Sequence, residues 1–175
     1  MKTTAKHKRP LLILVAGLPG SGKTTFAQRL ADALGARHLN SDLVREDMGL
    51  RGVYDEVTKA KVYNELKGRC KAELLKNHSV VIDATFYKKQ LRQPYVEMAA
   101  IAGVPMVAFV VTAAESIIRE RTSKTRLHTD ADFEVYRRIK AEFEPFDSPH
   151  YDLDSGQESP EEMIAQALTF LEDMV

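Results

Sequence analysis

Eight residues near the amino end, Gly17-Leu18-Pro19-Gly20-Ser21-Gly22-Lys23-Thr24, follow the pattern GxxxxGK[ST]. Glycines at these positions let the backbone curl so that successive N–H groups point inward, where they bind phosphate oxygens. In such a loop the lysine reaches the β- and γ-phosphates of a nucleotide, and the hydroxyl after it ligates magnesium. The pattern therefore predicts a site for ATP and Mg²⁺, with Lys23 as a catalytic residue, Thr24 as a metal ligand, and nucleotide contacts from Gly17, Pro19, Gly20, Ser21, Gly22, Lys23, Thr24 and Thr25.

A second metal ligand is expected at Asp83, which ends the apolar run VVID. Proteins with this type of loop commonly place a carboxylate there to hold magnesium. The alternative is a strand-end aspartate that caps the following turn. The five histidines are scattered without the spacing of metal ligands, so we assign them to surface or capping positions. Magnesium is thus the only metal expected.

A carboxylate and a guanidinium follow the second apolar run, in Asn40-Ser41-Asp42-Leu43-Val44-Arg45. A spacing of three places Asp42 and Arg45 on one face of a helical turn. Asp42 is a candidate general base that accepts the proton of an attacking hydroxyl, and Arg45 is a candidate for holding the acceptor or balancing developing charge. The alternative is that Asp42 or Ser41 only caps the helix while Arg45 is solvated.

Four cations, Arg119, Arg121, Lys124 and Arg126, fall within eight positions of a charged stretch that is poor in apolar residues. In-line phosphoryl transfer spreads negative charge, which an arginine on a closing lid stabilises. We therefore predict a lid at about residues 119–145, with its arginines, Arg121 and Arg126 included, as candidates for stabilising the transferred phosphoryl group. The competing interpretation is a solvated, charged helix end.

Apolar runs alternate with helical patterns along the whole chain. Strands are expected at residues 11–17, 36–40, 79–85 and 104–112, with a weak fifth at 151–154. Helices are expected at 23–34, 43–48, 55–77, 88–102, from 114, at 131–143 and from 160. This order predicts a doubly wound α/β fold with a five-stranded parallel sheet, whose ligand site lies at the carboxyl ends of the strands.

Length and composition limit the remaining possibilities. With 175 residues, 44% of them hydrophobic, we expect a single domain over residues 1–175. The absence of an apolar run of about 18 residues argues against a membrane span, and the basic first residues lack the features of a secretory signal. A cytoplasmic protein is expected, with its one cysteine, Cys70, in the core. No protein partner is predicted.

The net charge of zero is unevenly distributed. Residues 142–175 hold ten of the 25 acidic residues and no Lys or Arg, so residues 1–141 carry 25 basic and 15 acidic residues, a net of +10. A basic body attracts anionic ligands such as nucleotides, phosphosugars or nucleic acid, although an uneven solvated surface gives the same pattern.

Together these segments resemble the P-loop kinase family that contains the 5′-hydroxyl polynucleotide kinases and the zeta-toxin-like kinases, often described as AAA-like ATP-binding domains. The resemblance rests on GLPGSGKTT, NSDLVRE, VVIDATF and RERTSKTR followed by DFEVYRRIKAEFEP, and covers nearly the whole chain. It implies a fold of the nucleoside-monophosphate-kinase type, Asp42 as general base, Arg45 in the acceptor site, and lid arginines on ATP. The family's lid pattern, two arginines separated by three residues, would fall on Arg121 and Thr125. Arg126 is therefore the candidate to replace the second arginine.

Three functions fit these residues. The first is a kinase that transfers the γ-phosphoryl group of ATP to a hydroxyl, for which the 5′ end of DNA or RNA is one candidate. The second is a kinase of the same build that acts on a nucleoside, sugar or other small metabolite. The third is a nucleotide-binding regulatory module with little turnover, in which Asp42 would be dispensable. A switch GTPase is disfavoured because the guanine-reading pattern NKxD is absent from the sequence.

Overall fold

The computed structural model describes residues 9–124 and 133–174. Its strands form one parallel sheet in the order β2-β3-β1-β4-β5. The strands are β1 (Leu12–Ala16), β2 (Arg37–Asn40), β3 (Val80–Asp83), β4 (Met106–Thr112) and β5 (His150–Asp154). The five-stranded parallel sheet expected from the sequence is confirmed, including the weak fifth strand, which pairs with β4 at the edge.

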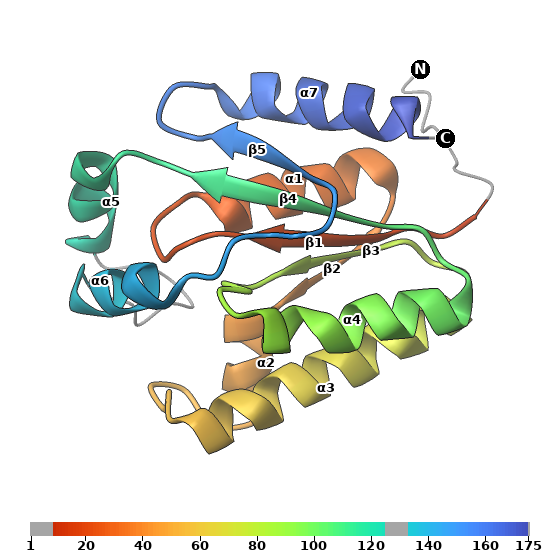
Figure 1. Ribbon diagram of the computed structural model, residues 1–175, viewed down its shortest axis with the longest axis horizontal. Helices are drawn as coiled ribbons and strands as arrows, with labels where there is room; N and C mark the ends of the chain where they lie inside the picture. Colours follow the sequence, from red (N-terminus) through yellow and green to blue (C-terminus); the bar gives the residue numbers. More distant parts are fainter. Residues whose placement is uncertain (1–8, 125–132, 175) are drawn as a thin grey trace.

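Helices cover both faces of the sheet (Figure 1). One face carries α1 (Lys23–Leu34) and α7 (Pro160–Asp173), and the other carries α2 (Ser41–Asp47), α3 (Glu56–Leu75) and α4 (Lys89–Ala102). Two further helices, α5 (Glu115–Thr122) and α6 (Phe133–Glu142), lie beyond the carboxyl ends of the strands. This is the doubly wound P-loop fold that the sequence predicts, with α5 and α6 placed over the edge where ligands bind in such folds.

Two apolar cores explain why β1 is a continuous apolar run. Leu12 and Leu14 point into the core under α3 and α4, whereas Ile13 and Val15 point into the core under α1 and α7. All five residues of β1 are buried because a central parallel strand is covered on both faces. Cys70 is buried on α3, as expected, and burial raises the pKa of its thiol to about 12.

Several element boundaries differ from the sequence-based expectation. The helix expected from residue 43 begins at Ser41, because Asn40 caps it by accepting a hydrogen bond from the backbone N–H of Leu43. The third strand ends at Asp83, and Phe86 shortly after it has a φ of 48°. The expected lid contains the end of α5 and all of α6, while residues 125–132 lie outside the described residues. Among the described residues, no helix is long and apolar enough to span a membrane.

Candidate active site

The phosphate-binding loop connects β1 to α1, as its sequence predicts. Gly20 and Gly22 have φ values of 82° and 90°, which side-chain-bearing residues rarely adopt. A Cβ on Gly17 would lie 2.5 Å from the backbone oxygen of Val111, so this position also has no room for a side chain. The loop therefore approaches neighbouring backbone closely, and α1 begins directly behind it with its N-terminal dipole end facing the loop.

A polar array at the ends of β2 and β3 lies next to this loop. The Nδ2 atom of Asn40 donates to Oδ2 of Asp83 at 2.7 Å and to Oγ1 of Thr24 at 3.5 Å. Asp83 is fully buried, and within the described part of the chain its Oδ1 atom has no hydrogen-bond partner. Asp83 does not cap the following turn, which was the alternative. A buried carboxylate oxygen without a donor beside a threonine hydroxyl fits a divalent cation, since magnesium prefers oxygen ligands.

His38 completes this array, and its expected place at the surface or at a helix cap is wrong. Its Nε2 atom lies 3.3 Å from Oδ2 of Asp83, and only 11% of its side chain is exposed. The sequence missed this contact because it depends on the pairing of β2 with β3, which sets Asn40 opposite Asp83. Alternate residues of a strand share a face, so His38 and Asn40 reach the same carboxylate.

Asp42 and Arg45 lie together on α2, as their spacing predicts. Arg45 donates from Nη1 to Oδ1 of Asp42 at 3.2 Å. Arg45 is 5% exposed, and its guanidinium lies 4.4 Å from the centre of the Tyr54 ring. The alternative of a capping Asp42 and a solvated Arg45 is therefore wrong, since Asn40 provides the cap and Arg45 is buried.

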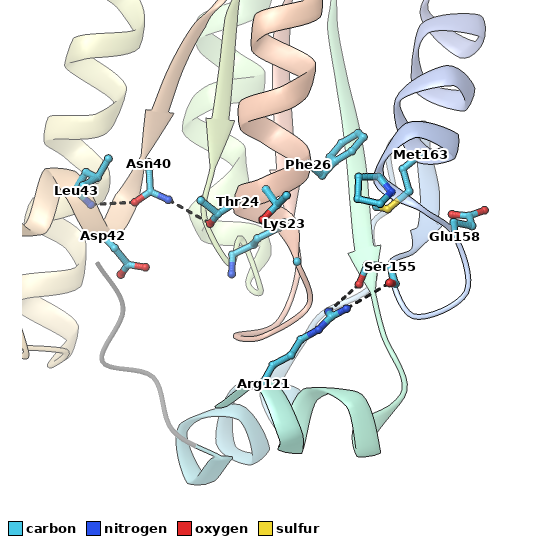
Figure 2. A pocket seen from close by; sticks show the side chains of 13 residues that line it. Lys23, Thr24, Phe26, Asn40, Asp42, Leu43, Arg121, Ser155, Glu158 and Met163 are labelled. Carbon is cyan, nitrogen blue, oxygen red and sulfur yellow. Dashed lines mark hydrogen bonds between the residues drawn. The ribbon is translucent and has the colours of Figure 1, made fainter. Parts of the chain in front are cut away.

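Two cavities meet at Lys23 and Asp42, which line both. The larger, of about 520 Å³, is shown in Figure 2; its other lining residues are Gly22, Thr24, Thr25, Phe26, Asn40, Leu43, Arg121, Ser155, Glu158, Pro160 and Met163. The smaller, of about 70 Å³, is bordered by α6 among other elements; its other lining residues are Pro19, Ser41, Arg45, Tyr54, Lys59, Tyr63, Thr85, Tyr87, Val135, Arg138 and Ile139. The side chains of Lys23 and Asp42 project toward the same space from α1 and α2 (Figure 2).

Arg121 links α5 to the phosphate-binding loop (Figure 2). Its Nη1 atom donates to the backbone oxygen of Gly20 at 3.0 Å and to Oγ of Ser155 at 2.9 Å. Ser155 in turn donates to the backbone oxygen of Ser21. One predicted lid arginine thus binds the loop both directly and through Ser155, a residue that the sequence analysis did not single out.

The other predicted residues lie in different places. Gly22, Lys23, Thr24 and Thr25 line the larger cavity, whereas Pro19 lines the smaller one. Gly17 and Ser21 line a third, more apolar cavity of about 390 Å³ behind the loop, between β4, α5 and α6. Arg126 lies outside the described residues. Arg119 stacks on Phe133 at 4.2 Å, and Lys124 pairs with Glu120 at the surface, so these two lid cations point to protein partners.

The chain is similar in sequence to several known proteins. An uncharacterized protein of Mycobacterium tuberculosis is 28% identical over 158 residues, which cover 83% of this chain and 32% of that protein, so the chain spans about a third of the relative's length. A probable adenylyl-sulfate kinase of Aeropyrum pernix is 25% identical over 182 residues and matches along the full length of both chains. A shikimate kinase of Corynebacterium efficiens is 30% identical over 175 residues, covering 94% of this chain and 98% of that enzyme.

Solved structures show the same fold. A sugar kinase from a Janibacter species superposes with a TM-score of 0.73 at 23% identity, covering 93% of this chain and 95% of that one. The APS kinase CysC of Mycobacterium tuberculosis, in complex with AMPPNP and APS, gives 0.74 at 18% identity, covering 94% and 98%. Kti12 of Chaetomium thermophilum, in complex with ADP-AlF3, gives 0.72 at 24% identity, covering 93% and 97%.

The match to a family model reaches from β1 to the segment after α6. Residues 12–146 match the family described as AAA domain. These residues include the phosphate-binding loop, the Asn40–Asp83 array, the Asp42–Arg45 pair and both α5 and α6. Because the match covers most of the chain and all of these features, the protein belongs to this AAA-domain family.

Proposed function

We propose that this protein is a kinase that transfers the γ-phosphoryl group of ATP to a hydroxyl of a small acceptor. The observation that carries the proposal is the junction of the two cavities at Lys23 and Asp42. A transferase needs its donor and acceptor to meet beside a phosphate-binding cation and a proton acceptor. The larger cavity contains the phosphate-binding loop and suits ATP, and the smaller one suits the acceptor hydroxyl.

The chemistry assigned to these side chains is in-line transfer. The acceptor oxygen attacks the γ-phosphorus, its proton passes to the Asp42 carboxylate, and the bond to the β–γ bridging oxygen breaks to release ADP. Lys23 stabilises the charge on the transferred group, and Arg45 orients Asp42 through their hydrogen bond. Arg121 and Arg126 are the lid residues that we assign to the ATP phosphates.

Magnesium is assigned to Thr24 and Asp83. The threonine hydroxyl and the unpartnered Oδ1 of Asp83 are suitable ligands, and Asn40 holds both residues in place. Magnesium keeps several waters and typically takes one or two protein oxygens together with substrate phosphates. When bound, it would neutralise charge on the β- and γ-phosphates.

A small acceptor is favoured over the 5′ end of a polynucleotide. The smaller cavity has a volume of only about 70 Å³ and is lined in part by Val135, Arg138 and Ile139 of α6. Relatives named adenylyl-sulfate kinase and shikimate kinase match nearly the whole chain. The more specific resemblance, to the 5′-hydroxyl polynucleotide kinases, stays a prediction. An oligonucleotide is therefore one of the acceptors in the test.

The test is transfer of label from γ-labelled ATP in the presence of Mg²⁺. The purified protein is incubated with a pool of small hydroxyl metabolites, with a 5′-hydroxyl oligonucleotide, or with neither. The Asp42→Asn variant serves as the control for contaminating kinases. We expect label in the small-molecule pool, reduced in the variant by about 10²–10⁴-fold, which corresponds to about 3–5.5 kcal/mol of barrier.

Three other results would change the proposal. Label in the oligonucleotide alone would replace the small acceptor with a polynucleotide. Equal transfer by the Asp42→Asn variant would remove Asp42 as the base. Nucleotide binding without ADP formation under any condition would favour the regulatory module instead.

A further inference from the structure

The smaller cavity is strongly cationic. Four of its lining residues are basic, namely Lys23, Arg45, Lys59 and Arg138, and Asp42 is the one carboxylate on its wall among the described residues. Lys23 belongs to the phosphate-binding loop and Asp42 is paired with Arg45. Lys59 and Arg138 therefore add positive charge beyond that of the phosphate-binding loop and the Asp42–Arg45 pair.

Arg45 has hydrogen-bonding capacity that the described residues do not use. Its guanidinium has five N–H donors, yet within this part of the chain only Nη1 donates, to Asp42. Its Nε atom is buried without a partner, and the residue as a whole is only 5% exposed. A buried charged group with unused donors is costly unless an acceptor completes it. An anion in the cavity would do so.

Lys59 is held at the cavity wall by partners that leave it a donor. Its ammonium group donates to Oε1 of Glu56 at 3.0 Å and to the hydroxyl of Tyr87. These contacts use two of its three donors. The side chain of Glu56 is 69% exposed and does not line the cavity, so the counter-charge lies toward solvent. Lys59 itself has a side chain only 14% exposed, and its third donor is available to a ligand.

Arg138 lines the cavity from α6, and its side chain is exposed. Within the described residues it has no hydrogen bond or ion pair, although Glu56, the partner of Lys59, is near enough to interact with it electrostatically. Lys59 on α3 and Arg138 on α6 thus provide two cations on the wall of one small cavity. Charged donors favour an anion over a neutral polyol, because the hydroxyls of a polyol accept hydrogen bonds but cannot offset the positive charge.

We propose that the acceptor is a small hydroxyl compound carrying an anionic group, and that Lys59 and Arg138, together with Arg45, bind that group. This inference rests on the proposed function, since it names the acceptor class of the same site. A carboxylate, sulfate or phosphate group meets the chemistry equally. The volume of about 70 Å³ suits such a compact group, whereas sites for whole drug-sized ligands are several-fold larger.

The first experiment measures anion binding without turnover. The protein is saturated with a non-hydrolysable ATP analogue and Mg²⁺, so that the phosphate-binding loop is occupied, and is titrated with inorganic sulfate by calorimetry and amide NMR. Lys59→Gln and Arg138→Gln remove one cation each. Lys61→Gln and Arg137→Gln are the matched controls, because both residues are exposed neighbours on the same helices that do not line the cavity.

We expect saturable sulfate binding that is weakened about 5- to 50-fold in Lys59→Gln and in Arg138→Gln, as for loss of a charge-assisted hydrogen bond. Affinity in both controls should stay within about 2-fold of the parent protein. The affinity for the ATP analogue and the thermal midpoint of each variant show that it is folded. No saturable sulfate binding, or sulfate binding by both test variants that is as tight as in the parent protein, would overturn the subsite.

The second experiment separates this inference from the proposed function. Label transfer from ATP is compared for acceptor pairs that differ only in charge, D-glycerate with glycerol and D-gluconate with D-glucitol. One outcome is sulfate binding that needs Lys59 and Arg138, with no label transferred to these acceptors, to the metabolite pool or to the oligonucleotide. That outcome would retain the subsite and reject the kinase. Transfer to a neutral acceptor that is unaffected by Lys59→Gln would retain the kinase and reject the subsite.

Discussion

Asn40 joins the nucleotide half of the site to α2, and its replacement has a cost that follows from its contacts. Its Oδ1 atom caps α2, and its Nδ2 atom donates to the fully buried Asp83 at 2.7 Å. Loss of an N-cap costs about 1 kcal/mol. Loss of a hydrogen bond to a buried charged group costs about 1.5–3 kcal/mol. Asn40→Ala should therefore lower the free energy of unfolding by about 2.5–4 kcal/mol.

Asn40→Ser separates the two contributions. A serine hydroxyl retains the cap but is too short to replace the amide donor to Asp83, so this variant should lose only about 1.5–3 kcal/mol. Equilibrium urea unfolding of both variants at neutral pH in EDTA measures the difference. A serine variant as stable as the parent would refute the contribution of the Asp83 bond. An alanine variant within about 0.5 kcal/mol of the parent would refute the whole argument.

Asn40→Asp tests the placement of magnesium at the same position. It keeps the cap but sets a second carboxylate beside Asp83, and like charges at this distance repel strongly in a buried site. In EDTA this variant should be less stable than Asn40→Ser. Because a divalent cation would relieve the repulsion, added Mg²⁺ should raise its thermal midpoint more than that of the parent protein. An equal response of both proteins would argue against a cation between Thr24 and Asp83.

Three further changes test other parts of the fold. The buried guanidinium of Arg92 donates to backbone oxygens on the β3–α4 loop and after α6. Arg92→Met leaves these oxygens without their donors and should lower the free energy of unfolding in urea by about 3–5 kcal/mol. Hydrogen bonds, foremost from His78, lower the pKa of Glu73 from 4.5 to about 2. Its stabilisation is present above pH 4.5 and lost as pH falls toward 2, so the thermal midpoint of Glu73→Gln should fall less over that range than the parent's. Gly22→Ala would set a Cβ 3.1 Å from a serine hydroxyl of the β5–α7 loop and should weaken binding of the ATP analogue, whereas Gly35→Ala, with a similarly positive φ but open space, should not.

The nucleotide half of the site was predictable because its residues are close together in the sequence. The loop from Gly17 to Thr24 contains its own geometric requirements, and the apolar run before it is typical of a strand buried on both faces. Spacing alone also placed Asp42 beside Arg45, since a helical turn brings residues three apart together. Local patterns of this kind do not depend on how distant segments pair.

Contacts between distant segments were not predictable from the sequence. Asn40 reaches Asp83 because β2 and β3 pair in one register, and a shift by one residue would turn its side chain to the other face. Arg121 reaches Ser155 because α5 lies next to the loop between β5 and α7. The pairing of Lys59 with Tyr87 likewise depends on how α3 packs against the end of β3. None of these partners has a spacing that identifies it.

This division explains which properties of the similar kinases can be expected in this protein and which cannot. The nucleotide half depends on one loop and the ends of two strands, so proteins that share the motif and the strand order can share ATP chemistry at low identity. The acceptor half is assembled from the phosphate-binding loop, α2, α3, the β3–α4 loop and α6, and single substitutions on any of them alter its charge. Lys59 and Arg138 are not part of the phosphate-binding motif, but both line the cavity. If the protein is the proposed kinase, its acceptor depends on these two positions more than on the motif that identifies the family.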